Sequence, residues 1–550
     1  MFLQHAYRPR PRCSGPTGCR GVPSATQIRC RRAVVGSPAA VKAPEAVTAA
    51  PLGPSAAELA AATPVPHVPG IPWVGPLNRL NLMSLFVGIT ELHREFKSRS
   101  LSFDLMGLRA VYVRHPEDIV HIMRTHADRY CKGVEQLAAM HEFLGEGLVT
   151  LPDGARHAEA RAVLDPGFRA EFVKGMLPTM AAVAQELVDT MLFKAGAGPA
   201  KDVEVEELCR RATLDVLGRT AFRFDFQALA VARGASQGVE LAAEAAQHKS
   251  VSGSAPRYAD AVTLWDAVLG PAMLIAFDMK IPNFIIPGYA GYQDGLRTFN
   301  QLVKTVISKR KAEGLEDGSK DLLTVMLQAQ QQGNSLMTDK HIRDELMVFL
   351  LAGSDTTAEL LAFACYELSR RPQLQQQVRA EVAGVLAGRP LTALTVEDTR
   401  GLKLLTACIN ETFRLYPAAT DLARDAKVDD VLGGHFIPKD TRIIINLFSC
   451  HRHEDFWPRP DEWLPERWLP EQQAVLGPRS PDAFMPFSTG GRACIGRYMA
   501  VLEAQVVLAV LLQRLELKPP TASAPAMTLK QSFTIKSGEG LYVSVEPLVY

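Results

Sequence analysis

Near the C-terminus the chain carries one cysteine inside a glycine-rich segment, FSTGGRACIG (residues 487–496). Gly490 and Gly491 allow backbone conformations that a Cβ forbids, and they let the segment approach a bulky flat partner closely. A strongly apolar helical stretch follows over 496–513, so Cys494 stands at a helix N-terminus, with Arg492 two residues away. The positive end of the helix dipole and a neighbouring cation both lower a thiol pKa, which favours a thiolate at Cys494.

A thiolate with no second cysteine and no histidine at ligand spacing is suited to a single axial bond to haem iron rather than to a zinc site. The alternative is a buried structural cysteine, because free cysteines are among the most buried residues. Further segments of the chain favour the haem ligand.

The segment AGSDTT (residues 352–357) lies in the middle of a predicted helix from about Asp339 to Arg371, which Pro372 stops. At 1.5 Å per residue this helix would span about 50 Å. Glycine, serine, aspartate and threonine are poor formers of a helix centre, and their side chains hydrogen-bond to the backbone, which bends or widens a helix. A long helix weakened at its midpoint predicts a functional groove there.

Glu411 and Arg414 are three residues apart before Pro417, so they share one helix face and can form a bidentate ion pair. On a surface such a pair would contribute little to stability. Pro465-Glu466-Arg467-Trp468 follows downstream and offers a second arginine.

The spacing Phe-x-x-Gly-x-Arg-x-Cys-x-Gly resembles the haem-binding loop of the cytochrome P-450 family, and the other motifs follow in that family's order over roughly residues 65–548. The resemblance implies a mainly α fold, a helical prism with small antiparallel sheets around a buried haem b. It implies that Cys494 is the axial thiolate and metal ligand, that Phe487 and Arg492 contact the cofactor, and that Arg467 closes a buried network with Glu411 and Arg414. Thr356 would hydrogen-bond the oxygen being activated, and Asp355 would relay protons to it.

The resemblance also implies ligands for the haem propionates. Aligned on Pro166 and Phe168, the family usually shows Trp-x-x-x-Arg where this chain has His157 and Arg161. The ring N–H of His157 keeps a donor at the tryptophan position, although as a pair the two residues also fit a solvated helix face. Arg424 is a further candidate by its position after Pro417, and Arg492 is another within the cysteine loop.

The function that the resemblance implies is a monooxygenase that inserts one atom of dioxygen into a hydrophobic substrate. Its electrons would come from a separate protein, a ferredoxin or an NADPH-dependent flavin reductase, because the chain has no motif for a flavin, a nicotinamide or an iron–sulfur cluster. Two alternatives are a relative that rearranges hydroperoxides without dioxygen or reductant, and a non-catalytic haem sensor of a ligand. Rearranging relatives depart from the 352–357 motif or the cysteine loop, and this chain keeps both. The Asp355-Thr356 pair argues against a sensor, because binding alone needs no proton delivery.

By analogy with the family, several segments would line a substrate pocket: the 131–150 connection, Met347, Leu350 and Leu351, residues 418–422 with Ala418, Ala419 and Leu422, and Phe533 in the turn before Ser537. Most are apolar, which indicates a hydrophobic ligand. Asp421 is the exception, and we expect it to face solvent. Stretches around 211–218 and 410–417 resemble the plastid carotenoid hydroxylases and fatty-acid hydroxylases, so a carotenoid, a fatty acid or another lipid is the expected class.

The N-terminal 44 residues contain seven arginines and no acidic residue, without the apolar core of a secretory signal, which is typical of organellar import signals. Their proline and glycine content favours a plastid, with the mitochondrion as the alternative. We therefore expect residues 1–63 to form a transit-like leader and flexible linker, and residues 64–550 to form a single haem-thiolate domain.

Composition excludes several classes of function. The formal net charge is +1, from 60 basic and 59 acidic residues, so no global field recruits nucleic acid. The 47% hydrophobic content fits a globular protein with a large core. No uninterrupted apolar run reaches the ~18 residues of a spanning helix, so we expect at most peripheral membrane contact. Strand-forming residues at 101–106 and 109–114 predict a hairpin, and the alternation at 541–545 predicts another sheet element. Helices are expected to dominate from Pro116 to about residue 415.

Overall fold

The computed structural model describes residues 53–70, 76, 80–81, 84–105, 108–132, 140–196, 202–240, 258–260, 262, 268, 288–315 and 321–548. The chain divides into two units, Met1–Ala50 and Pro51–Tyr550. The leader predicted in the first 44 residues lies outside the described residues. Residues 56–61, which we expected in a flexible linker, instead form helix α1 (Ala56–Ala61), because Ser55 and Glu58 complete a capping box.

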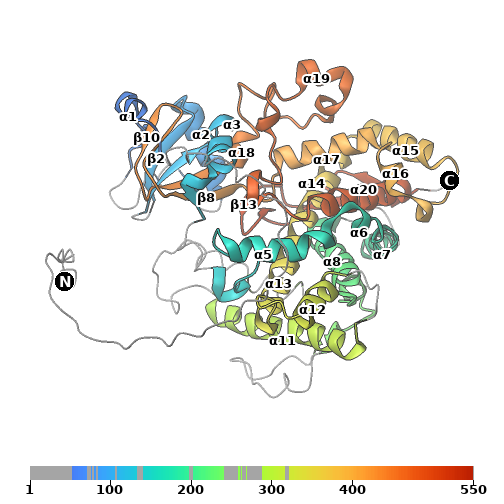
Figure 1. Ribbon diagram of the computed structural model, residues 1–550. Coiled ribbons are helices and arrows are strands. Elements are labelled where there is room, and N and C mark those ends of the chain that lie inside the picture. Colours follow the sequence, from blue (N-terminus) through green and yellow to red (C-terminus); the bar gives the residue numbers. More distant parts are fainter. Residues whose placement is uncertain are drawn as a thin grey trace, which may run out of the picture. The chain divides into compact units, whose positions relative to one another are not determined.

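Helices make up most of the second unit (Figure 1). Besides α1, the helices of the described residues are α2 (Leu85–Glu95), α3 (Pro116–Val120), α5 (Ala155–Leu164), α6 (Ala170–Lys174), α7 (Leu177–Ala195), α8 (Val205–Leu217), α9 (Ala228–Ala232), α11 (Tyr289–Glu313), α12 (Leu322–Gln331), α13 (Asp339–Leu350), α14 (Thr356–Ser369), α15 (Pro372–Leu386), α16 (Val396–Thr399), α17 (Lys403–Leu415), α18 (Leu447–Cys450), α19 (Pro470–Leu476) and α20 (Arg497–Arg514).

The strands form small sheets, of which the largest has the order β2 (Ser100–Leu105), β3 (Leu108–Val113), β11 (Arg442–Asn446), β8 (Asp421–Ala426) and β4 (Tyr130–Cys131). The predicted hairpin is confirmed as β2 and β3, and the predicted C-terminal strand is confirmed as β15 (Tyr542–Pro547), which pairs with β12 (Leu515–Lys518) and β5 (Asp202–Glu204). The remaining sheets contain β1 (Thr63–Pro64), β9 (Asp430–Leu432) and β10 (His435–Ile437), then β13 (Leu529–Gln531) with β14 (Ile535–Ser537), and β6 (Val239–Glu240) with β7 (Tyr258–Ala259).

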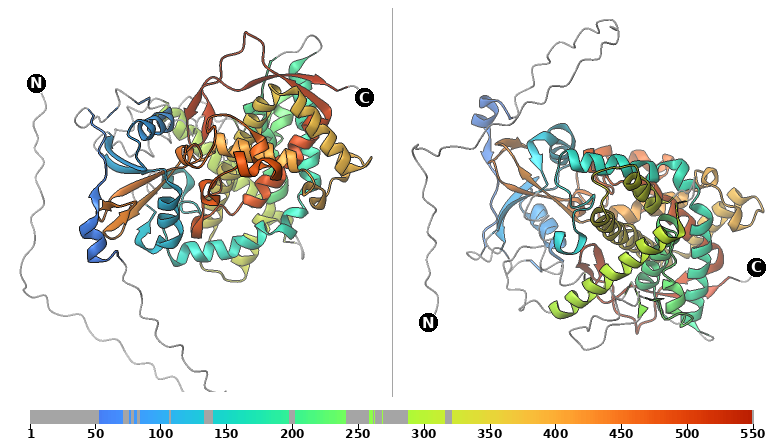
Figure 2. Two further views of the ribbon diagram at one scale, coloured as in Figure 1. Left: turned by 90° about the horizontal axis from the view of Figure 1, so that it is seen from above. Right: turned by 60° about the horizontal axis from the view of Figure 1, so that its bottom comes forward.

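The largest sheet is mixed, whereas we expected antiparallel sheets. β11 runs parallel to β3, although it is antiparallel to β8. A hairpin must be antiparallel, but more than 300 residues separate β3 from β11 and a long connection permits either direction. Figure 1 and both views of Figure 2 show early strands in blue beside late strands in orange within this sheet.

The predicted long helix is confirmed in three consecutive parts: α13, a π-helical turn η8 (Leu351–Asp355), and α14. By length and hydropathy alone, Asp339–Ser369 could cross a membrane, but 83% of its most apolar stretch is buried within the protein. It is therefore an internal helix of the fold, packed against α8, α17 and α20.

The predicted network around Glu411 is confirmed and is fully buried. Arg414 on α17 donates Nε to Glu411 Oε2 (3.0 Å) and Nη2 to Oε1 (2.8 Å), and Arg467 donates Nε to Oε1 (2.9 Å) from the short 3₁₀ turn η10 (Pro465–Trp468). Trp468 Nε1 and the Leu464 backbone N–H donate to the same carboxylate. The two cations lower the pKa of Glu411 against the effect of burial, so the carboxylate stays ionised.

We expect Glu411→Gln to lower the free energy of unfolding by about 3–5 kcal/mol, because it leaves two buried guanidinium groups without their carboxylate. The matched control is Glu91→Gln, since Glu91 forms the same i, i+3 pair with Arg94 on the surface and should cost under about 1 kcal/mol. Denaturant unfolding of both variants checks the difference, and equal losses would contradict a structural role for the buried network.

Candidate functional site

The cysteine loop is closed by backbone hydrogen bonds. Cys494 N–H donates to Phe487 C=O (2.9 Å) and Ala493 N–H donates to Gly490 C=O (3.1 Å). Gly490 has φ +73°, and a Cβ there would lie 1.9 Å from the Met123 carbonyl oxygen, so this position requires glycine. Phe487 is half-buried and packs edge-on against Phe413 of α17, with ring centroids 4.9 Å apart. The loop is thereby held between η2 (His121–Thr125) and α17.

The electrostatics of Cys494 differ in part from our expectation. α20 does begin three residues later, and the backbone N–H groups of Gly496 and Arg497 favour the thiolate. The expectation that Arg492 lowers the thiol pKa is wrong, because its guanidinium contacts Asp153 and the Leu151 carbonyl. The cations that favour the thiolate are Arg161 and Arg497. Burial outweighs these groups and raises the pKa of the thiol above its ordinary value.

Cys494 itself is exposed by solvent-accessible area, although enough protein surrounds it for burial to raise its pKa. Another group can therefore reach the sulfur. Among the described residues, Cys494 is the exposed cysteine, whereas Cys209, Cys365, Cys408 and Cys450 are buried and Cys131 is intermediate. This argues against a buried structural cysteine.

The predicted disturbance at the centre of the long helix is confirmed as a widened turn. η8 is widened to a π turn, Ser354 Oγ donates to the Leu350 carbonyl, and Thr356 Oγ1 donates to the Ala352 carbonyl (2.7 Å). Between residues 346 and 365 every position is buried except Ala352, Gly353 and Thr356. The open positions of an otherwise internal helix therefore coincide with its widened turn, and π turns of this kind are frequent at functional sites.

Asp355 points away from solvent into a polar cluster. It is 4% exposed, accepts from Thr534 Oγ1 (2.5 Å) and forms an ion pair with Lys536 Nζ (3.0 Å) of β14. The helix thus presents a hydroxyl at Thr356 beside a buried carboxylate, which is the residue pair that proton delivery needs.

A cluster of cations lies beside the cysteine loop. Arg492 Nε donates to Asp153 Oδ1 (2.6 Å), and the Lys132 backbone N–H donates to Asp153 Oδ2 (2.8 Å). Arg424 is 7% exposed, and burial lowers its pKa. The charge of Asp153 opposes this effect and that of Arg492 adds to it. Burial and the same two arginines lower the pKa of Lys132 to about 7. Two arginines and a lysine of lowered pKa surround one aspartate, so positive charge exceeds negative charge there, and a ligand with carboxylate groups would balance it.

His157 and Arg161 lie at the edge of this cluster on α5. His157 is buried, and burial together with Arg492 lowers its pKa to about 4, so the imidazole is neutral at pH 7 and keeps one N–H donor. Arg161 Nη1 donates to the Ala493 carbonyl (2.9 Å), next to Cys494. The structure thus brings together Cys494, Arg161, Arg492, His157 and Arg424. Sequence reasoning missed Lys132, a lone charge directly after strand β4, and Asp153, which lies two residues before α5.

The pocket segments are described only in part, since 133–139 lie outside the described residues. Met347, Leu350 and Leu351 are buried, and Ala419 is exposed. Our expectation that Asp421 faces solvent is wrong. Its Oδ1 is buried without a hydrogen-bond partner, as is Gln531 Oε1, and burial raises the pKa of Asp421 to about 6. The sequence could not show this because strand β8 places Asp421 under β13.

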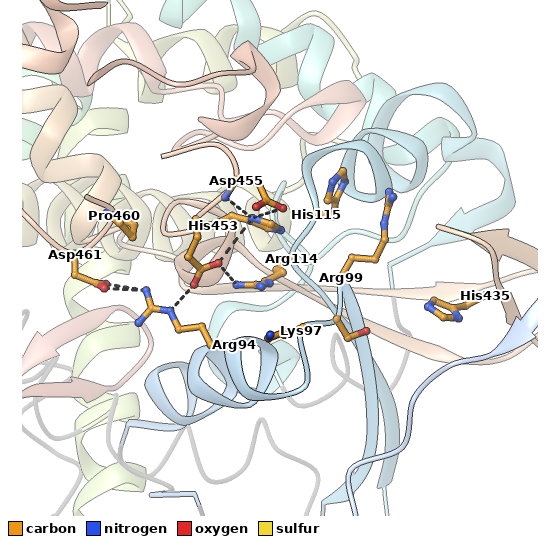
Figure 3. Close-up of a pocket in the computed structure, with 12 residues that line it drawn as sticks. Arg94, Lys97, Arg99, Arg114, His115, His435, His453, Asp455, Pro460 and Asp461 are labelled. Carbon is orange, nitrogen blue, oxygen red and sulfur yellow. Dashed lines mark hydrogen bonds and ion pairs between the residues drawn. The ribbon is translucent and has the colours of Figure 1, made fainter. Parts of the chain in front are cut away.

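A cavity of about 870 Å³ lies elsewhere, among α2, β3 and the 453–461 segment (Figure 3). Arg94 donates to Glu454 and Asp461, and Arg114 donates to Glu454, so its lining arginines are largely neutralised. None of the predicted site residues lines it. It is therefore separate from the cysteine loop.

The residues present fit a haem. An accessible cysteine faces out of a glycine-containing loop, cations suited to two propionates stand beside it, and a helix opens at its only unburied turn between residues 346 and 365. Cys494 would hold the iron, and Lys132, Arg424, Arg492 and His157 would hold the carboxylates.

We expect Asp421→Asn to stabilise the protein by up to about 3 kcal/mol at pH 8, since the folded pKa of about 6 lies above the ordinary value of 3.8. The raised pKa means that ionising Asp421 disfavours folding, so the advantage should grow between pH 4 and 6 and vanish below pH 4. Unfolding free energies at several pH values check this against Asp128→Asn, an exposed control. A difference in unfolding free energy that does not change with pH would contradict the burial of the Asp421 carboxyl.

Comparison with known proteins agrees with this geometry. The family model for cytochrome P450 matches residues 65–543. The chain is 28% identical over 451 residues to carotene epsilon-monooxygenase, chloroplastic, of Arabidopsis thaliana, covering 79% of this chain and 77% of that protein. It is 27% identical over 434 residues to Protein LUTEIN DEFICIENT 5, chloroplastic, of the same plant (79% and 69%), and 30% identical over 441 residues to cytochrome P450 4F4 of Rattus norvegicus (79% and 80%).

A solved structure shows the same fold. The crystal structure of the cytochrome P450DA heme domain superposes with a TM-score of 0.74 at 27% identity, covering 89% of this chain and 98% of that chain. The family and its fold carry haem b on a cysteine thiolate and take their electrons from a redox partner. The predicted monooxygenase is thereby supported over the rearranging enzyme and the sensor, and the chain belongs to the cytochrome P450 family of haem-dependent monooxygenases.

Proposed function

We propose that Cys494 is the axial ligand residue of this monooxygenase and that Lys132, Arg424, Arg492 and His157 bind the haem propionates. The accessibility of Cys494 within the hydrogen-bonded loop is the observation that carries this assignment. When bound, the haem supplies the redox centre at which dioxygen is reduced and one oxygen atom is inserted into substrate. Arg161 keeps the loop in place through Ala493 and adds positive charge beside the sulfur.

Thr356 and Asp355 are the proposed proton-delivery pair. The Thr356 hydroxyl lies at the widened turn, and in the structure it donates to Ala352, a bond that it can exchange for one to a reacting group. Asp355 keeps a carboxylate one residue earlier, held by Thr534 and Lys536. The pair can hold a proton close to the reacting oxygen while the apolar neighbours Leu350 and Leu351 exclude water.

The proposed substrate is a lipid-like molecule that carries a hydroxyl group. Asp421 Oδ1 and Gln531 Oε1 are buried acceptors without hydrogen-bond partners. Both residues lie beside Thr420, whose hydroxyl accepts from Gln531 Nε2 at 3.4 Å. A buried acceptor is costly unless a donor reaches it, and a substrate hydroxyl supplies one. Two relatives carry chloroplastic names, one of them a carotene monooxygenase, which supports a carotenoid over a fatty acid. Soret shifts with β-carotene, a hydroxylated carotenoid and lauric acid test this, and a shift with lauric acid alone would exclude a carotenoid.

The proposed location is the plastid, and the proposed electron donor is a ferredoxin, with a flavin reductase and the mitochondrion as the other possibilities. The acid-free, arginine-rich leader and the chloroplastic relatives support the plastid. Arg124, Arg169 and Arg497 are exposed near the cysteine loop and suit an acidic partner protein. Import of a fluorescent fusion of residues 1–63 into isolated chloroplasts tests the location, and salt-sensitive reduction by ferredoxin tests the donor.

We expect Cys494→Ser to abolish the carbon-monoxide absorption that marks a thiolate-ligated reduced haem, because a serine hydroxyl stays protonated. Arg492→Leu should keep that absorption but weaken haem retention about tenfold, the loss expected for one charge-assisted contact. Difference spectra and haem titration check both variants. A thiolate spectrum in Cys494→Ser would disprove the ligand assignment.

We expect Thr356→Ala to divert electrons from product to hydrogen peroxide, with product formed per electron falling at least about tenfold, because a positioned proton-transfer group contributes about 10²–10⁴-fold to a rate. Thr357→Ala is the matched control, since Thr357 is buried on the adjacent face. Product and peroxide are measured with the probe that gives the larger Soret shift. Equal amounts of product per electron in both variants would show that Thr356 does not deliver protons.

A further inference from the structure

A second acid lies beyond Asp355 on the same helix. Glu359 is four residues later on α14, one helical turn away on the same face, and it is fully buried. Neither of its carboxyl oxygens has a hydrogen-bond partner. A buried carboxylate without partners is too costly to remain charged, so this residue is carried as the neutral acid.

One cation lies between the two acids. Lys536 Nζ of β14 is 3.0 Å from Asp355 Oδ1 and 3.8 Å from Glu359 Oε1, and its residue is 7% exposed. The ammonium therefore contacts the carboxylate of Asp355 directly and reaches the acid of Glu359 with a small side-chain movement. Burial lowers the pKa of Lys536, but the Asp355 carboxylate opposes burial and the pKa is raised, so Lys536 stays protonated.

The cluster continues toward the surface through α8. Glu206 is 5% exposed and accepts from the Ser537 backbone N–H (3.3 Å), beside Lys536. Glu204 caps α8 and is half-buried. Burial and the charge of Glu206 raise the pKa of Glu204 to about 7. The groups that face Glu359 are thus Asp355 from its own helix, Lys536 from β14, and Glu206, Arg210 and Cys209 from α8.

Burial and the charge of Glu206 both raise the pKa of Glu359 well above its ordinary value. This agrees with the geometry, since the acids in this cluster outnumber the cations. A neutral carboxylic acid beside an ammonium and a carboxylate is an arrangement that can pass a proton without creating a new buried charge.

We propose that Glu359 is the second acid of the proton relay, passing its proton to Asp355 through Lys536. Lys536 gives one N–H proton to the Asp355 carboxylate, and the O–H proton of Glu359 restores the ammonium. Asp355 becomes the acid, Glu359 becomes the carboxylate, and Glu359 is protonated again from Glu206 and Glu204. The proposal rests on the roles proposed above for Asp355 and Thr356. Glu359 is a positioning residue, since it acts through Lys536.

The test uses Glu359→Gln in the holoenzyme, with Glu503→Gln as the matched control. Glu503 of α20 is equally buried (1% exposed), has an unpartnered Oε1, and its pKa is also raised by burial. Infrared difference spectra of the resting proteins at pH 7 should show that each variant has lost one protonated-carboxyl C=O band. An unchanged carboxyl region in Glu359→Gln would overturn the proposal, because Glu359 would then be ionised.

Turnover separates a relay from a structural role. With the carotenoid or fatty-acid probe that gives the larger Soret shift, Glu359→Gln should lower product formed per electron about tenfold, increase peroxide, and enlarge the solvent deuterium isotope effect. Glu359→Asp should restore part of the coupling, and Glu503→Gln should keep all of it. If Glu359→Gln forms as much product per electron as Glu503→Gln while Thr356→Ala forms less, the relay through Glu359 is wrong and the proposed function stands. If Thr356→Ala also stays coupled, both fail.

Discussion

The thiol of Cys494 has to lose its proton inside a protein body whose burial opposes that loss. Burial raises its pKa, and the structure sets against this the N–H groups of Gly496 and Arg497 and the charges of Arg161 and Arg497. A bound haem iron would favour the ionised form further, because a coordinated thiol is deprotonated. The glycine at 490, the loop hydrogen bonds and the start of α20 all serve to hold this one sulfur accessible and correctly placed.

Two buried clusters deal in opposite ways with the cost of burying an ionised carboxylate. Glu411 is surrounded by two arginines, a tryptophan N–H and a backbone N–H, so its charge is compensated and the network stabilises the segments behind the cysteine loop. Glu359 has no such donors and shares one lysine with Asp355. The first arrangement keeps a carboxylate permanently ionised, and the second leaves a proton available to move.

The long helix joins these parts. Its ends are ordinary α-helix, and its middle turn is widened where Ser354 and Thr356 hydrogen-bond to carbonyls four residues earlier. The widening exposes Ala352 and part of Thr356 while the flanking leucines stay buried. One helix therefore carries both the partly exposed turn that we propose faces the substrate and the buried acids Asp355 and Glu359.

The sequence by itself determined the long helix and its weak centre, the hairpin, the cysteine loop and the Glu411–Arg414 pair, because these depend on periodicity, glycine placement and residues close along the chain. Only the tertiary structure decided what depends on distant residues. It turned Arg492 to Asp153 instead of the thiol, added Lys132 to the cation cluster, buried Asp421 under β13, made the largest sheet mixed, and placed Lys536 between Asp355 and Glu359. Charges act through space, and no local pattern reports which distant side chain will lie within 4 Å.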